Sequence, residues 1–266
     1  MYDFILLGSN GFVGRNLNIF LRANNYKLLC VDRNSKYFNE KFYSSLPPAK
    51  FVLYLAEKNI IQDEYDKYFI DLNMKRLESA INASKGSKFI YFSSAVVYGD
   101  QSTKPRSTLD KVFSKNKYAE SKLKCEDLAL ANDALVIRLS NLYGTQMHHK
   151  NVFTDIISQL NNNKIVLKSL SPIRDFMFFS DLAEFVLALT KKWNNGLYNL
   201  GSGKGVRISE LVEMFLLFSN SKAEVFSELK DDSPSCLILD IDETSKTFDW
   251  KPKIKISEGI RRLLEK

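Results

Sequence analysis

Short, continuously apolar runs alternate with helix-like segments along the first half of the chain. The apolar runs lie at residues 4–7, 28–31, 51–56, 89–92 and 135–137. Runs of this length are typical of strands that are buried on both faces of a parallel sheet. The segments between them repeat apolar side chains every three to four positions, which predicts helices at about 12–24, 66–83 and 116–132. The alternation predicts an α/β fold, a Rossmann-like doubly wound parallel sheet.

The second half of the chain has a less regular pattern. Helices are predicted at about 152–160, 182–193, 209–218 and 256–264, and strands at about 165–167, 174–179, 197–200 and 225–226. We therefore expect a sheet domain at residues 1–144, to which the chain returns from about 174 to 203. Residues 145–173 and 204–266 are expected to form a smaller lobe that is interleaved with it in sequence.

A glycine-rich turn follows the first predicted strand and precedes the first helix. Its glycines, Gly8, Gly11 and Gly14, have the spacing G-x-x-G-x-x-G. Gly8 permits a tight turn, Gly11 lets a pyrophosphate approach the backbone, and Gly14 lets the helix pack closely on the strand. The free N–H groups and the dipole at the start of such a helix favour bound phosphates. Asp32 ends the next strand, where a carboxylate can accept both hydroxyls of an adenosine ribose, so the unit predicts dinucleotide binding.

The two residues after the second predicted strand indicate whether NAD or NADP is bound. Asp32 favours NAD, because the 2′-phosphate of NADP would meet a carboxylate. Arg33 directly follows it, and a guanidinium could instead bind that phosphate. NAD is therefore the predicted cofactor, and NADP stays open.

Tyr118 and Lys122 stand one helical turn apart on the predicted helix at 116–132. Positions i and i+4 share a face, so the phenol and the ammonium group can reach a common point. A phenol is normally a poor base at neutral pH, but a nearby cation favours the phenolate. The pair can thus form a proton-transfer group, provided that the rest of the chain supplies a reaction for it.

Composition narrows the range of partners. Hydrophobic residues make up 45% and charged residues 26% of the chain, an ordinary globular mixture. No run of about 18 apolar residues occurs, so we expect no membrane span. The net charge of +7 could suit nucleic acid or an anionic membrane, but the basic residues are dispersed. We therefore expect an anionic small molecule as partner and no nucleic acid.

Cysteine and histidine usage bears on compartment and on metals. Cys30, Cys125 and Cys236 are odd in number and scattered, which is typical of reduced thiols in a cytoplasmic protein. The N-terminus enters an apolar strand at once, without the features of a signal peptide. His148 and His149 are adjacent but have no Cys, Asp or Glu partner at a recognisable spacing, so no metal site is expected.

With these pieces in order, the sequence resembles the extended short-chain dehydrogenase/reductase family, in particular its NAD-dependent nucleotide-sugar epimerase/dehydratase branch. The resemblance covers nearly the whole chain. It is carried by the glycine turn at 8–14, the serine segment at 93–99, the Tyr118/Lys122 pair, and the segments 138–144, 174–176 and 198–203. The resemblance implies that residues 1–144 are a dinucleotide-binding Rossmann domain and that the smaller lobe binds the substrate.

The resemblance also implies roles for individual residues. Ser94 and Tyr118 are the catalytic pair at the substrate oxygen, with Tyr118 as acid/base, and Lys122 assists Tyr118 and binds the nicotinamide ribose. The implied cofactor contacts are Gly8, Gly11, Phe12, Val13, Gly14, Asp32, Arg33, Leu55, Ala56, Asn73, Ser93, Tyr118 and Lys122. Asn141 and Arg174, together with Ser94, are the implied substrate contacts. Alternatively, Asn141 satisfies a loop backbone and Arg174 forms a structural salt bridge, while Ser93 could be a capping hydroxyl only.

Two departures from the family pattern carry information. The 4,6-dehydratases of the family have an acid pair directly after the Ser/Thr, whereas Ala95 and Val96 occupy those positions in this chain. Neither side chain can shuttle a proton, so elimination of water through such a pair is not expected. In addition, the segment between Asp32 and Phe51 is short and irregular, and the aspartate expected beside the adenine is not identifiable.

The resemblance implies an NAD(P)-dependent oxidoreductase that acts at one carbon of a nucleotide-diphosphate sugar. Asp32 favours a C4 epimerase that recycles bound NAD, whereas the short chain favours a reductase of a nucleotide-linked 4-keto-(deoxy)sugar. A third reading is a non-catalytic NAD(P)-binding regulator, although such proteins often lose the tyrosine or lysine, and this chain has both. The family also implies a homodimer that pairs the helices at about 66–84 and 116–132.

Overall fold

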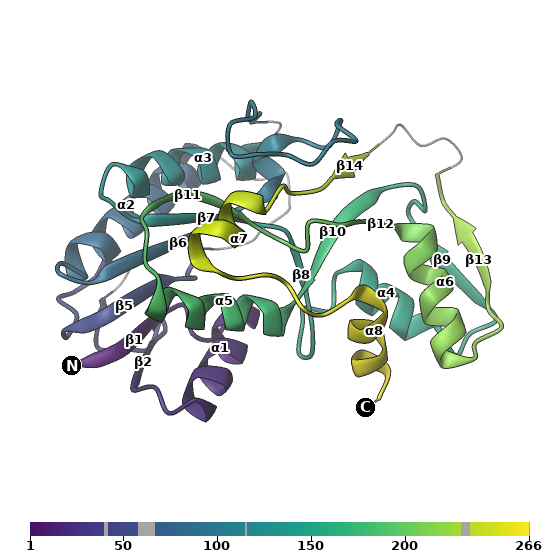
Figure 1. Ribbon diagram of the computed structural model, residues 1–266, viewed down its shortest axis with the longest axis horizontal. Helices are drawn as coiled ribbons and strands as arrows, with labels where there is room; N and C mark the ends of the chain where they lie inside the picture. Colours follow the sequence, from purple (N-terminus) through teal and green to yellow (C-terminus); the bar gives the residue numbers. More distant parts are fainter. Residues whose placement is uncertain (40–41, 58–66, 115, 230–234, 266) are drawn as a thin grey trace.

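A six-stranded parallel sheet forms the centre of the larger part of the molecule (Figure 1). The computed structural model describes residues 1–39, 42–57, 67–114, 116–229 and 235–265. The strands of this sheet are β1 (Tyr2–Leu7), β2 (Leu28–Val31), β5 (Ala49–Tyr54), β6 (Lys88–Ser94), β7 (Leu135–Leu139) and β11 (Gly196–Leu200). Their spatial order is β11-β7-β6-β5-β1-β2, and all neighbours run parallel. The predicted fold class is confirmed.

Helices cover both faces of the sheet (Figure 1). They are α1 (Phe12–Ala23) and α5 (Phe179–Lys191) on one face, and α2 (Lys67–Ala83) and α3 (Lys117–Leu130) on the other. Alternate residues of β1 supply the two cores: Phe4 and Leu6 pack with α1 and α5, whereas Ile5 and Leu7 pack with α2 and α3. This two-sided burial explains why the strand is apolar over its whole buried length.

A second region packs beside the carboxyl ends of the central strands. Its strands and helices are β8 (Asn141–Tyr143), α4 (Val152–Gln159), β9 (Lys164–Leu167), β10 (Ile173–Phe178), β12 (Gly205–Arg207), α6 (Ile208–Ser219), β13 (Glu224–Ser227), β14 (Cys236–Leu237) and α8 (Ile256–Leu264). β10 pairs with β8, β12 and β14, while β9 pairs with β13. A separate apolar cluster holds this region together, with Tyr143 stacked on Phe153 at a ring separation of 4.4 Å.

The return of the chain to the central sheet differs from the prediction. We expected the return from about residue 174, but only β11 joins the central sheet, and β10 belongs to the smaller four-stranded one. The reason lies in the alternation of side chains along β10. Phe176 and Phe178 pack in the core of the second region, and only Met177 between them joins the core of the central sheet.

Asp175 ties β10 to the turn that follows β11. Its side chain is buried and accepts hydrogen bonds from the backbone N–H groups of Ser202, Gly203 and Leu239 at 2.8, 3.1 and 3.3 Å. A Cβ atom at Gly201 would lie 2.6 Å from an Asp175 carboxylate oxygen, so this turn requires glycine. The 174–176 and 198–203 segments of the sequence are thus one structural unit.

Several smaller elements complete the chain. They are β3 (Phe38–Asn39), β4 (Phe42–Tyr43), the 3-10 helix η1 (Ala95–Tyr98) and α7 (Asp242–Phe248). β3 and β4 pair antiparallel within the stretch that was expected to be irregular. The predicted start of the second helix, Asp66, lies outside the described residues.

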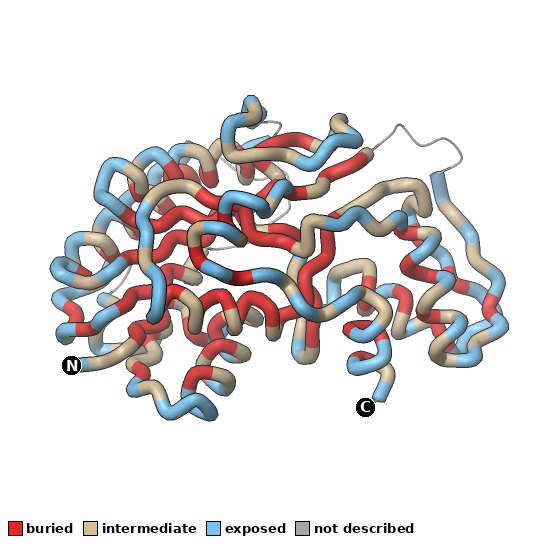
Figure 2. Tube along the Cα trace, in the orientation of Figure 1, coloured by how far each residue is buried: buried red, intermediate tan, exposed pale blue. Residues whose placement is uncertain are grey.

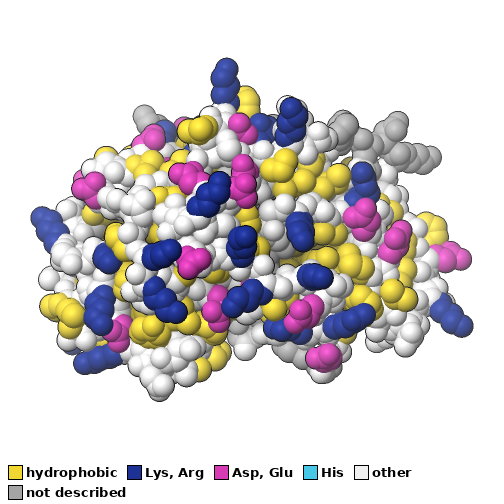
Figure 3. Space-filling model, in the orientation of Figure 1, with side chains coloured by type: hydrophobic (Ala, Val, Ile, Leu, Met, Phe, Trp, Pro, Cys, Tyr) yellow, Lys and Arg dark blue, Asp and Glu magenta, His cyan; other side chains and the backbone are white. Residues whose placement is uncertain are grey.

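Burial follows the central strands and the inward sides of the helices (Figure 2). On the face drawn in Figure 3, lysine and arginine side chains are spread among aspartate and glutamate and do not form one basic patch. Within the described part of the chain, no helix has both the length and the apolar character that crossing a membrane requires.

Candidate active site

The glycine turn links β1 to α1 and has the close packing that its sequence predicts. Gly8 has a φ of +91°, and a Cβ atom there would lie 2.7 Å from the backbone of Leu55 and Ala56. A Cβ atom at Gly14 would lie 2.6 Å from the carbonyl oxygen of Gly8. Gly11 precedes α1, and among the described residues no side chain caps this helix end. The first N–H groups of α1 thus remain open to a phosphate, as a dinucleotide site requires.

A cavity of about 450 Å³ extends from this turn to the end of β2. Its lining includes the predicted residues Gly8, Gly11, Asp32, Arg33, Leu55 and Ala56, together with Tyr43 and Arg76. The Asp32 carboxylate accepts a hydrogen bond of 2.7 Å from the Asn10 side chain, which orients it at the cavity wall. A carboxylate at this point suits the adenosine ribose of NAD, so the residues present fit the predicted cofactor.

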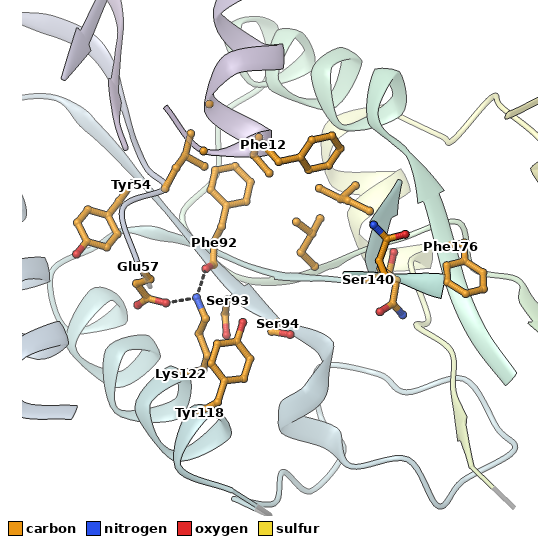
Figure 4. Close-up of a pocket in the computed structure, with 18 of the residues that line it drawn as sticks. Phe12, Tyr54, Glu57, Phe92, Ser93, Ser94, Tyr118, Lys122, Ser140 and Phe176 are labelled. Atoms are coloured by element: carbon orange, nitrogen blue, oxygen red, sulfur yellow. Dashed lines mark hydrogen bonds and ion pairs between the residues drawn. The ribbon is translucent and has the colours of Figure 1, made fainter. Parts of the chain in front are cut away.

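Tyr118 and Lys122 lie on one face of α3, as their spacing predicts. Asn116 caps the helix by accepting a hydrogen bond of 2.8 Å from the N–H of Ala119. The Lys122 ammonium lies 5.7 Å from the centre of the Tyr118 ring and donates a hydrogen bond of 2.9 Å to the Phe92 carbonyl. Both side chains face the open space beside the end of β6 (Figure 4).

Glu57 is a candidate functional side chain that the sequence analysis missed. It follows Leu55 and Ala56 after β5, and its carboxylate forms a buried ion pair with Lys122 (Figure 4). Burial alone would lower the pKa of Lys122, but the charge of Glu57, followed by Tyr118, outweighs it and raises the pKa above the usual value. One sequence signal for Glu57 was available: it is an acidic residue that directly follows the predicted buried strand at 51–56.

A larger cavity of about 610 Å³ joins the start of α1 to Tyr118 and Lys122. Gly11, Phe12, Val13, Gly14, Leu55, Ser93, Ser94, Tyr118, Lys122 and Asn141 are the predicted residues that line it. Ser94 reaches it from the end of β6, and its hydroxyl oxygen also accepts a hydrogen bond of 3.3 Å from the N–H of Val96. The three predicted catalytic side chains therefore border the same space as the predicted nicotinamide end of the cofactor site.

The positions after Ser94 form the short helix η1. Ala95 is buried there and Val96 is half-buried, and both line a neighbouring cavity of about 270 Å³ together with Ser94. Neither side chain carries an ionisable group. The ionisable residues described along the two cavities are Tyr54, Glu57, Tyr118 and Lys122 in the large one and Asp100 and Arg174 in the smaller one.

Ser93 lines the large cavity, and its hydroxyl also joins a buried polar cluster. Its hydroxyl donates to Glu126 of α3, which also accepts a hydrogen bond of 2.7 Å from Arg138 of β7. The Arg138 guanidinium lies 4.7 Å from the centre of the Tyr98 ring. The cluster thus links α3 to β6 and β7.

Three other predicted residues have firm contacts within the chain. Asn73 of α2 is buried and donates a hydrogen bond of 3.2 Å to Ser121 of α3. Asn141 lines the large cavity while its amide donates to the Asp175 carbonyl at 3.2 Å. The Arg174 guanidinium donates to the Ser235 hydroxyl at 2.6 Å and lies 3.6 Å from an Asp100 carboxylate oxygen. It still lines two cavities next to Asn141, where it can contact an anion.

Metal-binding groups do not gather in the described part of the chain. No set of three or more His, Cys, Asp or Glu residues there could hold a metal ion. His148 and His149 stack on each other at a ring separation of 4.2 Å before α4.

Comparison with known proteins agrees with the family resemblance of the sequence motifs. A sequence model of the NAD dependent epimerase/dehydratase family matches residues 4–201. The dTDP-4-dehydro-6-deoxyglucose reductase of Escherichia coli is 24% identical, with 98% of this chain and 96% of the reductase aligned. The family description names NAD, in agreement with the predicted cofactor.

Solved structures share the fold over the full chain. The structure of RMD from Pseudomonas aeruginosa, complexed with NADPH, has a TM-score of 0.86 and 21% identity, covering 100% of this chain and 98% of that one. The UDP-glucose 4-epimerase of Thermotoga maritima, with UDP-glucose, has a TM-score of 0.83 and 20% identity, covering 99% and 97%.

Proposed function

Because the chain belongs to the NAD dependent epimerase/dehydratase family, we propose that it interconverts a hydroxyl and a ketone at one carbon of a nucleotide-diphosphate sugar. The observation that carries the proposal is the large cavity, in which Ser94, Tyr118 and Lys122 border the same space as the start of α1. Ala95 and Val96 support a reaction confined to one carbon, because neither can assist the loss of water.

Tyr118 moves the proton in this reaction. When the sugar hydroxyl is oxidised, the phenolate of Tyr118 accepts its proton; when a ketone is reduced, the phenol donates one to the oxygen. Ser94 donates a hydrogen bond to the same oxygen as its charge changes. Lys122 supplies a positive charge beside the phenolate, and its ammonium is anchored on the Phe92 carbonyl.

The glycine turn and Asp32 would hold the cofactor at the other end of the site. The N–H groups at the start of α1 would bind the pyrophosphate, and Asp32 would accept hydrogen bonds from the adenosine ribose. When bound, the nicotinamide supplies the acceptor or the donor of hydride. The chain's own groups then orient the sugar and manage its proton.

Epimerisation at C4 is the leading form of the reaction. An epimerase oxidises the carbon, lets the keto-sugar turn, and restores the hydrogen on the opposite face, so it needs a cofactor that stays bound. Asp32, oriented by Asn10, supports retention of NAD through the cycle. The similarity to a UDP-glucose 4-epimerase accords with this form.

Reduction of a nucleotide-linked 4-keto-(deoxy)sugar is the second candidate. The similarity to a dTDP-4-dehydro-6-deoxyglucose reductase accords with this form. Arg33 and Arg76 beside Asp32 would suit NADPH as the reductant.

The proposal extends to the substrate and the assembly. Arg174 and Asn141 border the cavities next to Ser94 and would bind the diphosphate of the substrate, on the side formed by the smaller lobe. We also propose a cytoplasmic homodimer that pairs α2 and α3, which lie next to each other on one face of the sheet (Figure 1).

A screen of nucleotide sugars and their 4-keto forms separates the two candidates. Purified protein is incubated with each compound and with NAD, NADH or NADPH, and nicotinamide absorbance and sugar products are followed. An epimerase converts its substrate with cofactor present only in trace amounts, whereas a reductase consumes one reduced cofactor per product. Absence of turnover with every compound and cofactor would contradict the proposal.

A further inference from the structure

Glu57 lies where the two cavities of the site meet. It follows β5, and its side chain lines both the cavity at Asp32 and the larger one at Tyr118. The side chains of Glu57 and Lys122 are only 7% and 6% exposed, so the carboxylate and the ammonium are held together away from bulk water.

Both carboxylate oxygens of Glu57 have a partner. Oε1 accepts a hydrogen bond of 2.7 Å from the Tyr91 hydroxyl, and Oε2 contacts the Lys122 ammonium. Burial, followed by the charge of Glu57, raises the pKa of Tyr91 well above its usual value, so Tyr91 remains a donor. The carboxylate therefore bridges β6 and α3 in a fixed orientation. Figure 4 shows its contact with Lys122.

Five other ionisable groups of the described residues surround the pair. They are Tyr54 of β5, Arg76 of α2, Tyr91 of β6, and Tyr118 and Cys125 of α3. Burial, followed by the charge of Glu57, raises the pKa of both Tyr54 and Cys125, which keeps these groups neutral. Arg76 is itself a cation. Among the described residues around Lys122, Glu57 is thus the carboxylate that balances the ammonium group, and its charge has a larger effect than that of Tyr118.

We propose that Glu57 is a positioning residue that keeps Lys122 charged and holds its ammonium group in the cavity wall beside Tyr118. The proposal rests on the proposed function, because Lys122 matters there as the cation that assists Tyr118. Its basis is geometric: a buried ion pair, a second hydrogen bond that fixes the carboxylate, and a place at the junction of the two cavities.

Because Lys122 is buried, loss of the Glu57 carboxylate should change its protonation. An ammonium group without a counter-charge is strongly destabilised in a buried site and gives up its proton at a lower pH. The Phe92 carbonyl would still accept a hydrogen bond from Lys122, but a neutral amine cannot stabilise a phenolate by its charge. Glu57→Gln should therefore lower the pH at which Lys122 loses its proton.

NMR of protein labelled with ¹⁵N-lysine measures this directly and needs no substrate. The Nζ resonance of Lys122 is identified as the one that Lys122→Met removes. In the unaltered protein, we expect this resonance to remain in its charged form up to a pH of roughly 10. In Glu57→Gln, its midpoint should fall by about two pH units or more.

Glu120→Gln is the matched control. Glu120 also lies on α3 and also pairs with lysines, Lys117 and Lys124, but the two lysine side chains are 52% and 44% exposed. This variant should leave the Lys122 midpoint unchanged within a few tenths of a pH unit. A Lys122 resonance that titrates alike in Glu57→Gln and in the unaltered protein would overturn the proposal.

A double-mutant cycle in thermal unfolding covers the case in which Glu57→Gln folds but is too unstable for the titration. Removing both charges, as Glu57→Gln/Lys122→Met, should give a higher Tm than Glu57→Gln alone, because no buried charge is left unpaired. Additive effects of the two changes would contradict the proposal. Neither readout depends on turnover, so failure of the proposed function, judged by the nucleotide-sugar screen, is distinguishable from failure of this inference.

Discussion

Asp32 is held in a defined orientation at the end of β2. Its Oδ2 accepts a hydrogen bond of 2.7 Å from Asn10, and its Oδ1 accepts one of 2.9 Å from the N–H of Asn34. Arg33 and Arg76 line the same cavity. A carboxylate favours the ribose hydroxyls of NAD, whereas guanidinium groups favour the 2′-phosphate of NADP. We therefore expect the choice between NAD and NADP to depend on these side chains.

Replacing Asp32 by asparagine should change this choice. Asp32→Asn removes the charge but keeps the size of the side chain, so NAD binding is expected to weaken about tenfold, the effect of losing about 1.4 kcal/mol. NADP binding should weaken less or improve, because the repulsion of its 2′-phosphate is gone. Calorimetric titration with each dinucleotide measures both effects. Asp127→Asn, on the exposed side of α3, is the control. An unchanged ratio of the two affinities would count against a ribose role for Asp32.

Residues whose roles depend on local geometry could be predicted from the sequence. Gly8 and Gly14 are required by a turn of a few residues, and Tyr118 and Lys122 share a helical face, so spacing alone indicated their arrangement. Glu57 could not be predicted in this way, since its partners Tyr91 and Lys122 come from distant elements. Such contacts depend on how the strands and helices pack together. The sequence pattern within one strand or helix does not indicate that packing.

At the scale of elements, the C-terminal helix α8 depends on close contact with β8. A Cβ atom at Gly259 would lie 2.0 Å from the hydroxyl oxygen of Tyr143. Tyr143 cannot move easily, because it is buried, stacked on Phe153 and packed edge-on against Phe178 at a ring separation of 5.2 Å. Gly259 therefore permits α8 to pack on the strand that leads from the active site into the second region.

Gly259→Ala should destabilise the protein through this contact. The added methyl group overpacks the core of the second region, and we expect a loss of about 1–3 kcal/mol in the free energy of unfolding, although alanine is the better helix former. Urea denaturation measures the change. Glu258→Ala, one position earlier, removes an ion pair with Arg262 whose side chains are 48% and 44% exposed, and should cost far less. Equal stability of Gly259→Ala and the unaltered protein would contradict the packing described.

Helices and strands with a clear hydrophobic pattern were predicted well. Short strands that form only by pairing with a distant strand were not predicted. The helix predicted at 256–264 is found at those residues, and the five apolar runs of the first half are all strands of the central sheet. The short strands β12 and β14 and the helix α7 were missed. β12 and β14 have too few residues for a hydrophobic period to be evident. They form because they pair with the two edges of β10.

At the scale of the whole molecule, the site lies where the two regions meet. The central sheet contributes the glycine turn, Glu57 and Ser94 at the ends of β1, β5 and β6, while α3 contributes Tyr118 and Lys122. Asn141, Phe153 and Phe176 close the same cavity from the second region. Crevices at the carboxyl ends of parallel strands are where ligands bind in open α/β sheets. The proposed cofactor site and the proposed sugar-binding space therefore lie in neighbouring cavities of this crevice.

The comparison of Tyr118→Phe with the unaltered protein tests the central claim most directly. The variant keeps the aromatic ring but cannot exchange a proton, so binding of NAD(H) should remain within about threefold. Turnover of the nucleotide sugar identified by the screen should fall by roughly 10²–10⁴-fold, the usual contribution of a general acid–base group. If Tyr118→Phe retains full turnover with intact cofactor binding, the proton passes through another group and Tyr118 is not the acid/base of the reaction.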